Sequence, residues 1–403
     1  MSGPGRIVLH GGQVIDGTGA APAAADVVVE DGIIVDVGSG LDGDEGVDVS
    51  GLTVMPGFID CHVHTVFSGV EQQRMLQEPF SYQFYAAARN MALTLDTGVT
   101  TVRDAGGADL GMKQAVADGL IEGPRLLTAI TVLGQTGGHT DGWCASGGCV
   151  PLLQPHPGRP GMIVDGPDEM RRRVRELVRA GADTIKICTS GGVISPRDDP
   201  RHAHFSAEEL DICVAEATAA GLDVMAHAQG AQGVKNAIRS GVHSIEHGVF
   251  LDDEAIDLLV ATGTWLVPTL MASHALLRAA ATGTRLPLAV LDKARAAADQ
   301  HQISIARAVD AGVRIAMGTD SGVFPHGDNL DELDFLHTAG MTALGALTSG
   351  TSAAAQLLGI GDTVGTVQPG KLADLVCVEG DPLDLVDYRK KITQVWQHGH
   401  RRR

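Results

Sequence analysis

The sequence VMPGFIDCHVH, residues 54–64, joins an apolar run to two closely spaced histidines. The run from 54 to 60 contains Pro56-Gly57 and predicts a short buried strand with a turn at its entrance. Alternate residues of an extended chain point to the same side, so His62 and His64 can place both imidazoles on one side of the strand's C-terminal tip. The pair is therefore a candidate bidentate metal site, and two polar surface histidines are the alternative.

The composition of the whole chain narrows the class of protein. A length of 403 residues with 44% hydrophobic side chains predicts one large α/β barrel or two to three domains. Only 3% of the residues are aromatic whereas 52 are glycine, which favours tight turns over aromatic recognition surfaces. The net charge of −19 repels phosphate backbones, so we expect no nucleic-acid partner.

Neither a secretory leader nor a membrane span is expected. The N-terminal segment has no basic region followed by a long apolar core, and no apolar run reaches ~18 residues. We therefore expect a soluble cytoplasmic protein without a membrane partner. The six cysteines are scattered and predict reduced thiols, although Cys144 and Cys149 are close enough to pair.

Both ends of the chain have the pattern of β-hairpins. Residues 6–55 alternate apolar and polar side chains in short pieces, and Glu30-Asp31-Gly32 predicts a turn between two strands. A similar pattern returns in GTVQPGKLADLVCVEGDP and ITQVWQHGH near the C-terminus. We expect residues 1–55 and 362–403 to form one composite β-sandwich.

Between these ends, short β-like runs alternate with longer helical runs. Counting the run at 54–60, eight strands alternate with helices across residues 56–361, which predicts a parallel sheet closed into a (β/α)8 TIM barrel. Ser206 followed by Glu209 predicts a capping box at the start of a helix. The glycines expected to end helices are Gly181, Gly221, Gly241, Gly263 and Gly312.

Polar residues follow several of these strands and would face one shared pocket. They are His62 and His64 after the first strand, Lys186 at the fourth, His227 at the fifth, His247 at the sixth and Asp320 at the eighth. Imidazole nitrogens and carboxylate oxygens suit Zn²⁺. An ammonium beside two dications would be repelled, so Lys186 would have to be deprotonated or converted by CO2 into a bridging carbamate; an ion pair in the barrel core is its alternative.

Taken together, these motifs resemble the amidohydrolase superfamily over essentially the whole chain. The matching segments are GFIDCHVH (57–64), ADTIKICTSGGV (182–193), MAHAQG (225–230), SIEHG (244–248), GTDSG (318–322) and GTVQPGKLADLV (365–376). Within the superfamily they look most like the imidazolonepropionase-related branch, which includes Xaa-Pro dipeptidases and carries a carboxylated lysine with a binuclear metal centre.

The resemblance implies a role for each matching residue. His62, His64 and Asp320 would bind the more buried metal ion, His227 and His247 the other, and carboxylated Lys186 would bridge both together with a hydroxide. Asp320 would also take a proton from that hydroxide and return it to the leaving group. The implied cofactors are two divalent ions, with zinc expected. Cys61 lies between the histidines but points to the opposite side, so we expect it in the core.

Substrate contacts are less defined. His139, in the loop after the third strand, is a candidate hydrogen-bond partner for a substrate carbonyl or carboxylate, or else a loop residue held by its neighbours. A polar stretch after the fourth strand would act as a lid or remain a solvated loop; it contains Arg197, Arg201, His202 and His204. Gln229 stands where many dipeptidases of the branch carry Tyr or a second His, and unlike them it cannot ionise.

We expect a hydrolase of an amide-type C–N bond (EC 3.4 or 3.5 type), a dipeptidase or an N-acyl amino acid hydrolase or carboxypeptidase, that acts on a small molecule as a homo-oligomer. The alternative is a hydrolase of a cyclic amide of imidazolone type, a carbamate or another small amide or ester. An aromatic-ring deaminase is disfavoured because such sites normally use one metal. A catalytically silent scaffold would have lost metal ligands, and none of the six is missing.

Overall fold

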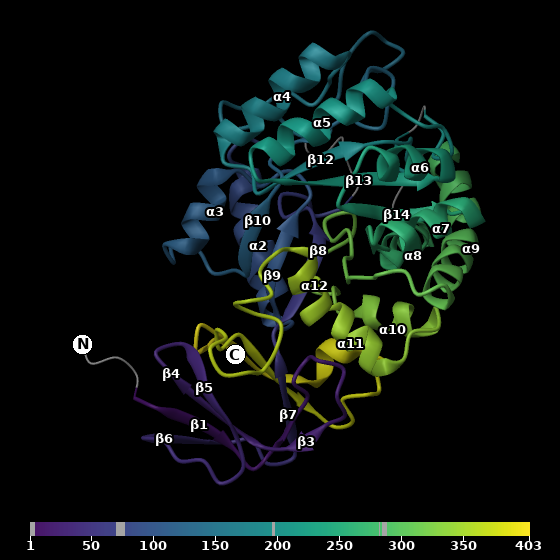
Figure 1. Cartoon of the computed structure of the whole chain (residues 1–403). Helices are drawn as coiled ribbons and strands as arrows, with labels where there is room; N and C mark the ends of the chain where they lie inside the picture. The colour runs from purple at the N-terminus through teal and green to yellow at the C-terminus, as the bar shows by residue number, and fades with distance from the viewer. Residues whose placement is uncertain (1–4, 70–76, 196–197, 282, 284–287) are drawn as a thin grey trace.

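The computed structural model describes residues 5–69, 77–195, 198–281, 283 and 288–403. These residues form an α/β protein in which parallel strands and helices occupy the middle of the chain, while antiparallel sheets combine both ends (Figure 1). Among them, no helix has the length and apolar character needed to cross a membrane.

The two ends of the chain contribute two sheets that lie together, as the purple and yellow strands in Figure 1 show. The four-stranded sheet has the order β5 (Ile33–Gly38), β4 (Asp26–Glu30), β1 (Ile7–His10) and β6 (Glu45–Asp48). The six-stranded sheet has the order β18 (His400–Arg401), β17 (Ile392–Gln397), β16 (Leu375–Glu379), β7 (Leu52–Pro56), β2 (Gln13–Val14) and β3 (Ala23–Ala24). The predicted turn at Asp31-Gly32 joins β4 to β5, and both of its residues have positive φ.

The run at 54–60 is not one strand, as the sequence suggested, but parts of two. β7 ends at Pro56 and pairs with β16, whereas β8 (Phe58–Val63) pairs with β9 (Val99–Asp104) in a different sheet. The change occurs at Gly57, where a Cβ atom would lie 2.3 Å from Thr100 Oγ1. Only a glycine therefore lets the chain pass between the two sheets at this point.

The middle of the chain contains two parallel sheets. The first has the order β10 (Arg125–Thr128), β9 and β8. The second has the order β11 (Val132–Leu133), β12 (Thr184–Cys188), β13 (Asp223–Gly230), β14 (Ser244–Phe250) and β15 (Trp265–Val267). Because all these strands run the same way, their carboxyl ends lie on one side of the molecule.

The eighth predicted strand, residues 313–322, is not a regular strand in the structure. It makes only isolated parallel bridges, one to Leu266 of β15 and one to Val63 of β8. Further backbone hydrogen bonds join Leu266 to Arg314 and Ala316, and β8 residues Cys61 and His62 to Met317 and Asp320. The segment therefore lies between β15 and β8 and bonds to both, although its backbone is too irregular for a ladder.

The helices pack around these parallel strands (Figure 1). They are α2 (Tyr82–Asp96), α3 (Leu110–Ala117), α4 (Pro167–Ala180), α5 (Ala207–Ala219), α6 (Ala231–Arg239), α7 (Asp253–Thr262), α8 (Leu270–Ala281), α9 (Leu288–Asp310), α10 (Asp331–Thr338), α11 (Ala343–Ser349) and α12 (Ser352–Leu357). The predicted capping box at Ser206 and Glu209 is present at the start of α5. All five predicted terminating glycines have positive φ.

Candidate metal centre

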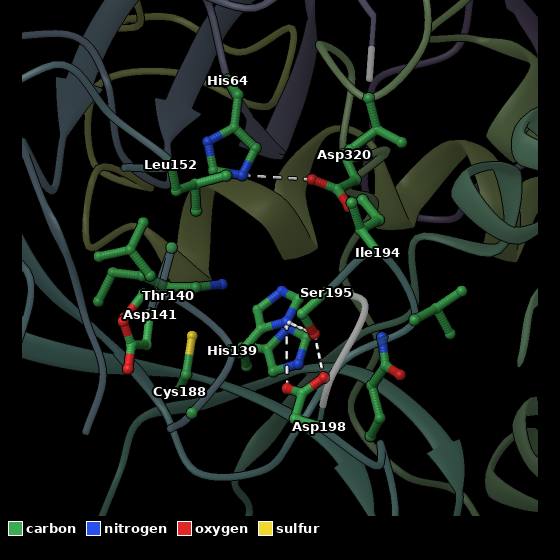
Figure 2. A pocket seen from close by; sticks show the side chains of 18 of the residues that line it. His64, His139, Thr140, Asp141, Leu152, Cys188, Ile194, Ser195, Asp198 and Asp320 are labelled. Carbon is green, nitrogen blue, oxygen red and sulfur yellow. Dashed lines mark hydrogen bonds and ion pairs between the residues drawn. The ribbon is translucent and has the colours of Figure 1, made fainter. Parts of the chain in front are cut away.

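The six residues singled out as metal ligands all line one cavity of about 420 Å³. His139 and Gln229 line the same cavity. Figure 2 shows His64 and Asp320 on one side of it, facing His139 across the open space. Residues that lie far apart in the sequence, such as His62 and Asp320, therefore meet at the carboxyl ends of the parallel strands, where the alternation of strands and helices places one shared pocket.

Five imidazole rings form a continuous row in this cavity. The separations of ring centroids are 5.6 Å for His64–His62, 5.1 Å for His62–His247, 4.6 Å for His247–His227 and 4.4 Å for His227–His139. The last two rings are stacked, with 14° between their planes. No apolar core requires five adjacent imidazoles, so the row indicates a site that binds something.

Four of these rings have one nitrogen fixed by a hydrogen bond, which leaves the other nitrogen free for the cavity. The Nδ1 atoms of His62, His64 and His247 lie 2.7 Å from Glu246, from the Gly106 carbonyl and from Thr269 Oγ1, respectively. In His227 the roles are exchanged, because Nε2 lies 3.0 Å from the carbonyl of Gly191. Three rings thus present Nε2 to the cavity and one presents Nδ1. Histidines that bind metals are typically oriented in this way, by a hydrogen bond to the ring nitrogen that does not bind the metal.

Lys186 lies beside the row, next to His62, and is almost fully buried. Its Nζ is 3.5 Å from His62 Nε2, and burial lowers its pKa. Burial also lowers the pKa values of His62, His227 and His247 well below the usual range, with the nearby Lys186 charge acting in the same direction. Neutral imidazoles and a lysine that readily gives up its proton are the forms in which these groups bind metals.

Asp320 supplies the carboxylate. Its Oδ1 lies 3.3 Å from His64 Nε2 and 3.5 Å from His62 Nε2 (Figure 2). Burial favours the neutral acid, but the hydrogen bond to His64 and the charges of His62, His64 and Lys186 outweigh it and lower the pKa of Asp320 to about 2. Ligand atoms of His62, His247 and Asp320 all lie within 4.8 Å of one another, close enough to hold one ion.

Two of these residues have a backbone conformation that residues other than glycine rarely adopt. His247 has φ of 77° and Asp320 has φ of 62°. Left-handed backbone at a non-glycine residue is uncommon and concentrates at functional sites. At β14 this conformation lets His247 and the preceding Glu246 both approach His62, which simple strand alternation does not predict.

Glu246 is a fully buried polar residue beside the cavity that the sequence reasoning missed. Its carboxylate, fully buried, receives hydrogen bonds from His62 Nδ1 at 2.7 Å, Arg103 at 2.9 Å and Ser244 at 2.5 Å. Arg103 in turn donates to the carbonyl of Cys61 at 2.7 Å. A glutamate directly before a candidate ligand was the available signal, but two of its partners, His62 and Arg103, come from other strands.

His139 is held by the segment after β12. Its Nδ1 is 2.9 Å from Ser195 Oγ and 3.6 Å from Asp198, which also bonds to Ser195 (Figure 2). Lys293 of α9 donates to the backbone carbonyls of Gly192, Ser195 and Asp198 at 2.5–2.8 Å. Neither Asp198 nor Lys293 was anticipated from the sequence.

The stretch after the fourth predicted strand, which was considered as a lid, does line the cavity. The residues that do so are not the polar ones that the sequence analysis named. Val193, Ile194, Ser195 and Asp198 line it. Arg201 instead lies over the ring of Phe250, 4.9 Å from its centroid. His202 and His204 are also not among the lining residues, and Arg197 lies outside the described residues.

The cysteines take no part in disulfides. All six are free, including Cys144 and Cys149, as the scattered spacing predicted. Cys61 is buried in an apolar cluster with Ile59 and Val267 and does not line the cavity, in agreement with its expected place in the core. Cys188, two residues beyond Lys186, does line it (Figure 2).

An α/β fold that gathers imidazoles, a lysine and a carboxylate at the carboxyl ends of parallel strands belongs to the class of metal-dependent hydrolases. The sequence profile of the amidohydrolase family matches residues 53–401, and this chain therefore belongs to that family. The resemblance inferred from the motifs is thus confirmed at the level of the superfamily.

Individual relatives cover nearly the whole chain. Ochratoxinase of Aspergillus niger is 34% identical over 417 residues, which span 97% of this chain and 85% of the relative. Imidazolonepropionase of Cutibacterium acnes is 29% identical over 353 residues, 82% of this chain and 76% of the relative. A crystal structure of a Xaa-Pro dipeptidase with bound methionine superposes with a TM-score of 0.90 at 34% identity, covering 98% of both chains.

Proposed function

We propose that this chain is a binuclear metal-dependent hydrolase that cleaves the amide-type C–N bond of a dipeptide or an N-acyl amino acid. The observation that carries the proposal is the row of buried imidazoles around Lys186, in which four rings each keep one nitrogen free for the cavity. Relatives named as a dipeptidase and as an imidazolonepropionase support hydrolysis of a C–N bond.

The donor set fits two divalent ions. His62, His64 and Asp320 would hold one ion, and His227 and His247 the other, with Lys186 as a carbamate between them. The carbamate forms when neutral Nζ attacks CO2 and a proton is released, which turns a repelled cation into an anion suited to dications. Zinc is the proposed metal, because neutral imidazoles and carboxylates are its usual ligands.

When bound, the ions would polarise the scissile carbonyl and lower the pKa of the attacking water. The chain's own residues supply the proton transfers. Oδ1 of Asp320 takes a proton from the attacking water and returns it to the leaving nitrogen as the C–N bond breaks. His139 has Nδ1 turned to Ser195 and Asp198, so its Nε2 is the atom available to orient the substrate's carbonyl oxygen.

We also propose that the strands of the middle region and residues 313–322 close into a (β/α)8 barrel. The backbone bonds of 313–322 to both β15 and β8 support this closure. In this division residues 56–361 form the catalytic domain, and residues 1–55 and 362–403 form the composite β-sandwich.

A hydrolase of a cyclic amide, a carbamate or another small amide or ester is the second candidate. It is favoured by Gln229, which places an uncharged side chain in the cavity. Assembly into a homo-oligomer stays a prediction, which light scattering of the purified protein would check, and so does a cytoplasmic location.

The test combines metal analysis with a substrate library. We expect two metal equivalents in freshly purified protein and chelator-sensitive hydrolysis of a dipeptide or N-acyl amino acid. Lys186→Met should lose at least one metal equivalent and roughly 10³-fold or more in kcat/KM, because the proposed bridging anion is gone. Lys113→Met, which removes a lysine paired with Asp183 away from the cavity, is the matched control. Absence of chelator-sensitive cleavage of any C–N bond would contradict the proposal.

A further inference from the structure

An apolar wall, defined as Val193, Ile194 and Val323, lines part of the cavity. All three residues belong to one apolar cluster or pack against it, and the buried residues behind them come from β14, α8 and α9: Val249, Leu276, Ala294 and Ala297. Ile194 and Val323 are only partly buried, so they leave apolar surface at the cavity. Because a strand and two helices support this surface, it is held in place, and covering it with the apolar atoms of a ligand is favourable.

The apolar wall lies next to Asp320. Val323 donates its backbone N–H to the carbonyl of Asp320 at 3.1 Å, so both residues belong to one turn. Figure 2 shows Ile194 on the Asp320 side of the cavity. Since Asp320 is the residue proposed to return a proton to the leaving nitrogen, that nitrogen must come within hydrogen-bond distance of its carboxylate. The side chain carried by the leaving amine therefore lies against the apolar wall.

The charged residues of the cavity already have partners or belong to the candidate metal centre. Among the described residues that line the cavity, the side chains with a permanent charge are Lys186, Asp320, Asp141 and Asp198. The first two are candidate metal ligands. Asp141 accepts hydrogen bonds from two backbone N–H groups, and Asp198 is paired with Lys293. A charged substrate side chain placed against the apolar wall would therefore lose its water without gaining a counter-charge from these residues.

We propose that the apolar wall selects substrates whose leaving amine carries a large apolar side chain, such as that of leucine, and discriminates against aspartate, glutamate, lysine and arginine at this position. The inference rests on the proposed C–N hydrolase and names the class of its leaving group. It concerns the side chain only, because the α-carboxylate is common to all these amino acids.

A matched series of substrates tests the selection. The N-acetyl derivatives of glycine, leucine, aspartate and lysine, and the corresponding alanyl dipeptides, differ within each set only in the side chain on the leaving amine. We expect kcat/KM for leucine to exceed that for glycine at least about tenfold, the effect of burying the apolar side chain. It should exceed that for aspartate and for lysine at least about 100-fold. If leucine is turned over no better than glycine, aspartate or lysine, the inference is wrong while the proposed hydrolase stands.

Variants assign the selection to the apolar wall. Ile194→Asp places a carboxylate there and should reduce the ratio of kcat/KM for leucine to that for lysine at least about tenfold. Ile194→Ala removes apolar surface without adding a charge and should reduce the ratio for leucine to glycine roughly fivefold. Ile303→Asp, on the exposed side of α9, is the matched control and should change neither ratio. Unchanged ratios in both Ile194 variants at full metal content would contradict the assignment.

A second pair of substrates tests which side of the scissile bond meets the apolar wall. N-hexanoyl-glycine and N-acetyl-glycine differ only in the acyl chain, and we expect Ile194→Ala to leave the ratio of their kcat/KM values unchanged. If the variant alters this ratio but not that of leucine to glycine, the apolar wall contacts the acyl group and the inference is wrong.

Binding decides the outcome if none of these amides is cleaved. Thermal melting of the metal-loaded protein is then measured with free leucine, glycine and aspartate. If leucine alone raises Tm, and Ile194→Asp abolishes this effect, the hydrolase proposal fails but the selection of an apolar amine stands. If leucine raises Tm no more than glycine or aspartate does, the inference fails together with the proposed function.

Discussion

Glu246 connects the candidate metal centre to the buried interior through a single contact, the 2.7 Å hydrogen bond to His62 Nδ1. Arg103 and Ser244 fix the carboxylate on its other side, so the ring of His62 is held in one orientation with Nε2 toward Lys186. Partners of this kind, behind a metal-ligating histidine, strengthen both its basicity and its positioning.

The first prediction concerns this contact. Glu246→Gln should weaken zinc binding by roughly 10–100-fold, because the imidazole loses an anionic partner. The measurement is competitive titration of zinc into chelator-stripped protein. Glu332→Gln is the control, since Glu332 is equally buried but accepts hydrogen bonds from the backbone N–H groups of Leu270 and Met271, outside the cavity. Unchanged zinc affinity in Glu246→Gln would show that His62 does not depend on this partner.

Among single residues, the sequence predicts the candidate metal ligands better than the residues that hold them in position. His62, Lys186 and His227 lie near the carboxyl ends of β8, β12 and β13, so their meeting in one cavity follows from parallel topology. Glu246 is different because its position next to His247 assigns the two to opposite faces of a regular strand. The left-handed backbone of His247 removes that opposition, and it depends on tertiary packing that local pattern does not encode.

A second prediction follows from Asp198. Burial favours its neutral form, but hydrogen bonds and charges from His139, Ser195 and Lys293 outweigh this and lower its pKa to about 2. The pKa in the folded protein lies below the ordinary aspartate value of 3.8, so the stabilisation is present above pH 3.8 and is lost as the pH falls toward 2. Wild-type protein, stripped of metal, should lose about 1 kcal/mol between pH 5 and 3 through this group. Urea unfolding at both values should give Asp198→Asn a correspondingly smaller loss, and parallel losses would contradict the assignment.

Among the elements, α9 has a specific connection to the cavity wall. Lys293 inserts its ammonium among three carbonyls of the segment 192–198, which also carries Ser195 and Asp198 behind His139. The helix therefore anchors residues 192–195 and 198, which belong to no strand or helix.

The third prediction is that Lys293→Met loosens this segment without emptying the metal centre. We expect faster tryptic cleavage at Arg201 in the native protein, because the anchoring bonds are lost, and a roughly tenfold lower kcat/KM, because His139 is less well positioned. Metal content should equal that of wild type. Lys113→Met again serves as the control, and equal cleavage rates in both variants would exclude an anchoring role for Lys293.

Strands and helices were predicted correctly where the apolar residues recur with a clear period. The strands that contain Lys186, His227 and His247 and the helices between them occur where expected. The two predictions that were wrong both concern the conformation of the backbone. Gly57 divides one apolar run between two sheets because no Cβ fits against Thr100, and residues 313–322 lose ladder geometry where Asp320 turns toward the cavity. Apolar patterning carries no information on either constraint.

In the whole molecule, the β sheets of the two ends and the parallel strands share their interior. The largest apolar cluster contains Phe58 of β8 together with Val376, Ile392 and Tyr388 from the C-terminal part. Tyr388 is fully buried and packs edge-on against Phe58, with ring centroids 5.8 Å apart. The sequence patterns placed the two chain ends together, but they could not reveal that both regions have one continuous core.

This shared core leads to the fourth prediction, that the two regions unfold in one transition. Domains with a small polar interface unfold separately, whereas a large apolar interface couples them. Trp396 in β17 reports on the terminal sheet and Trp265 in β15 on the parallel sheet. Single-tryptophan variants that retain one or the other, with Trp143 replaced in both, should give coincident urea transitions.

Asp374 allows a sharper version of this test because it joins the two regions directly. Its buried carboxylate accepts from Arg125 of β10 at 3.0 Å and from the backbone N–H of His398 at 2.8 Å. Asp374→Ala should therefore destabilise both regions together by about 2–4 kcal/mol, since it leaves a partly buried cation and an N–H without their partner. If the Trp396 signal shifts to lower urea while the Trp265 signal stays in place, the terminal sheets are an independent unit. A common shift requires that the sheets from the chain ends and the strands that carry the metal centre fold as one cooperative structure.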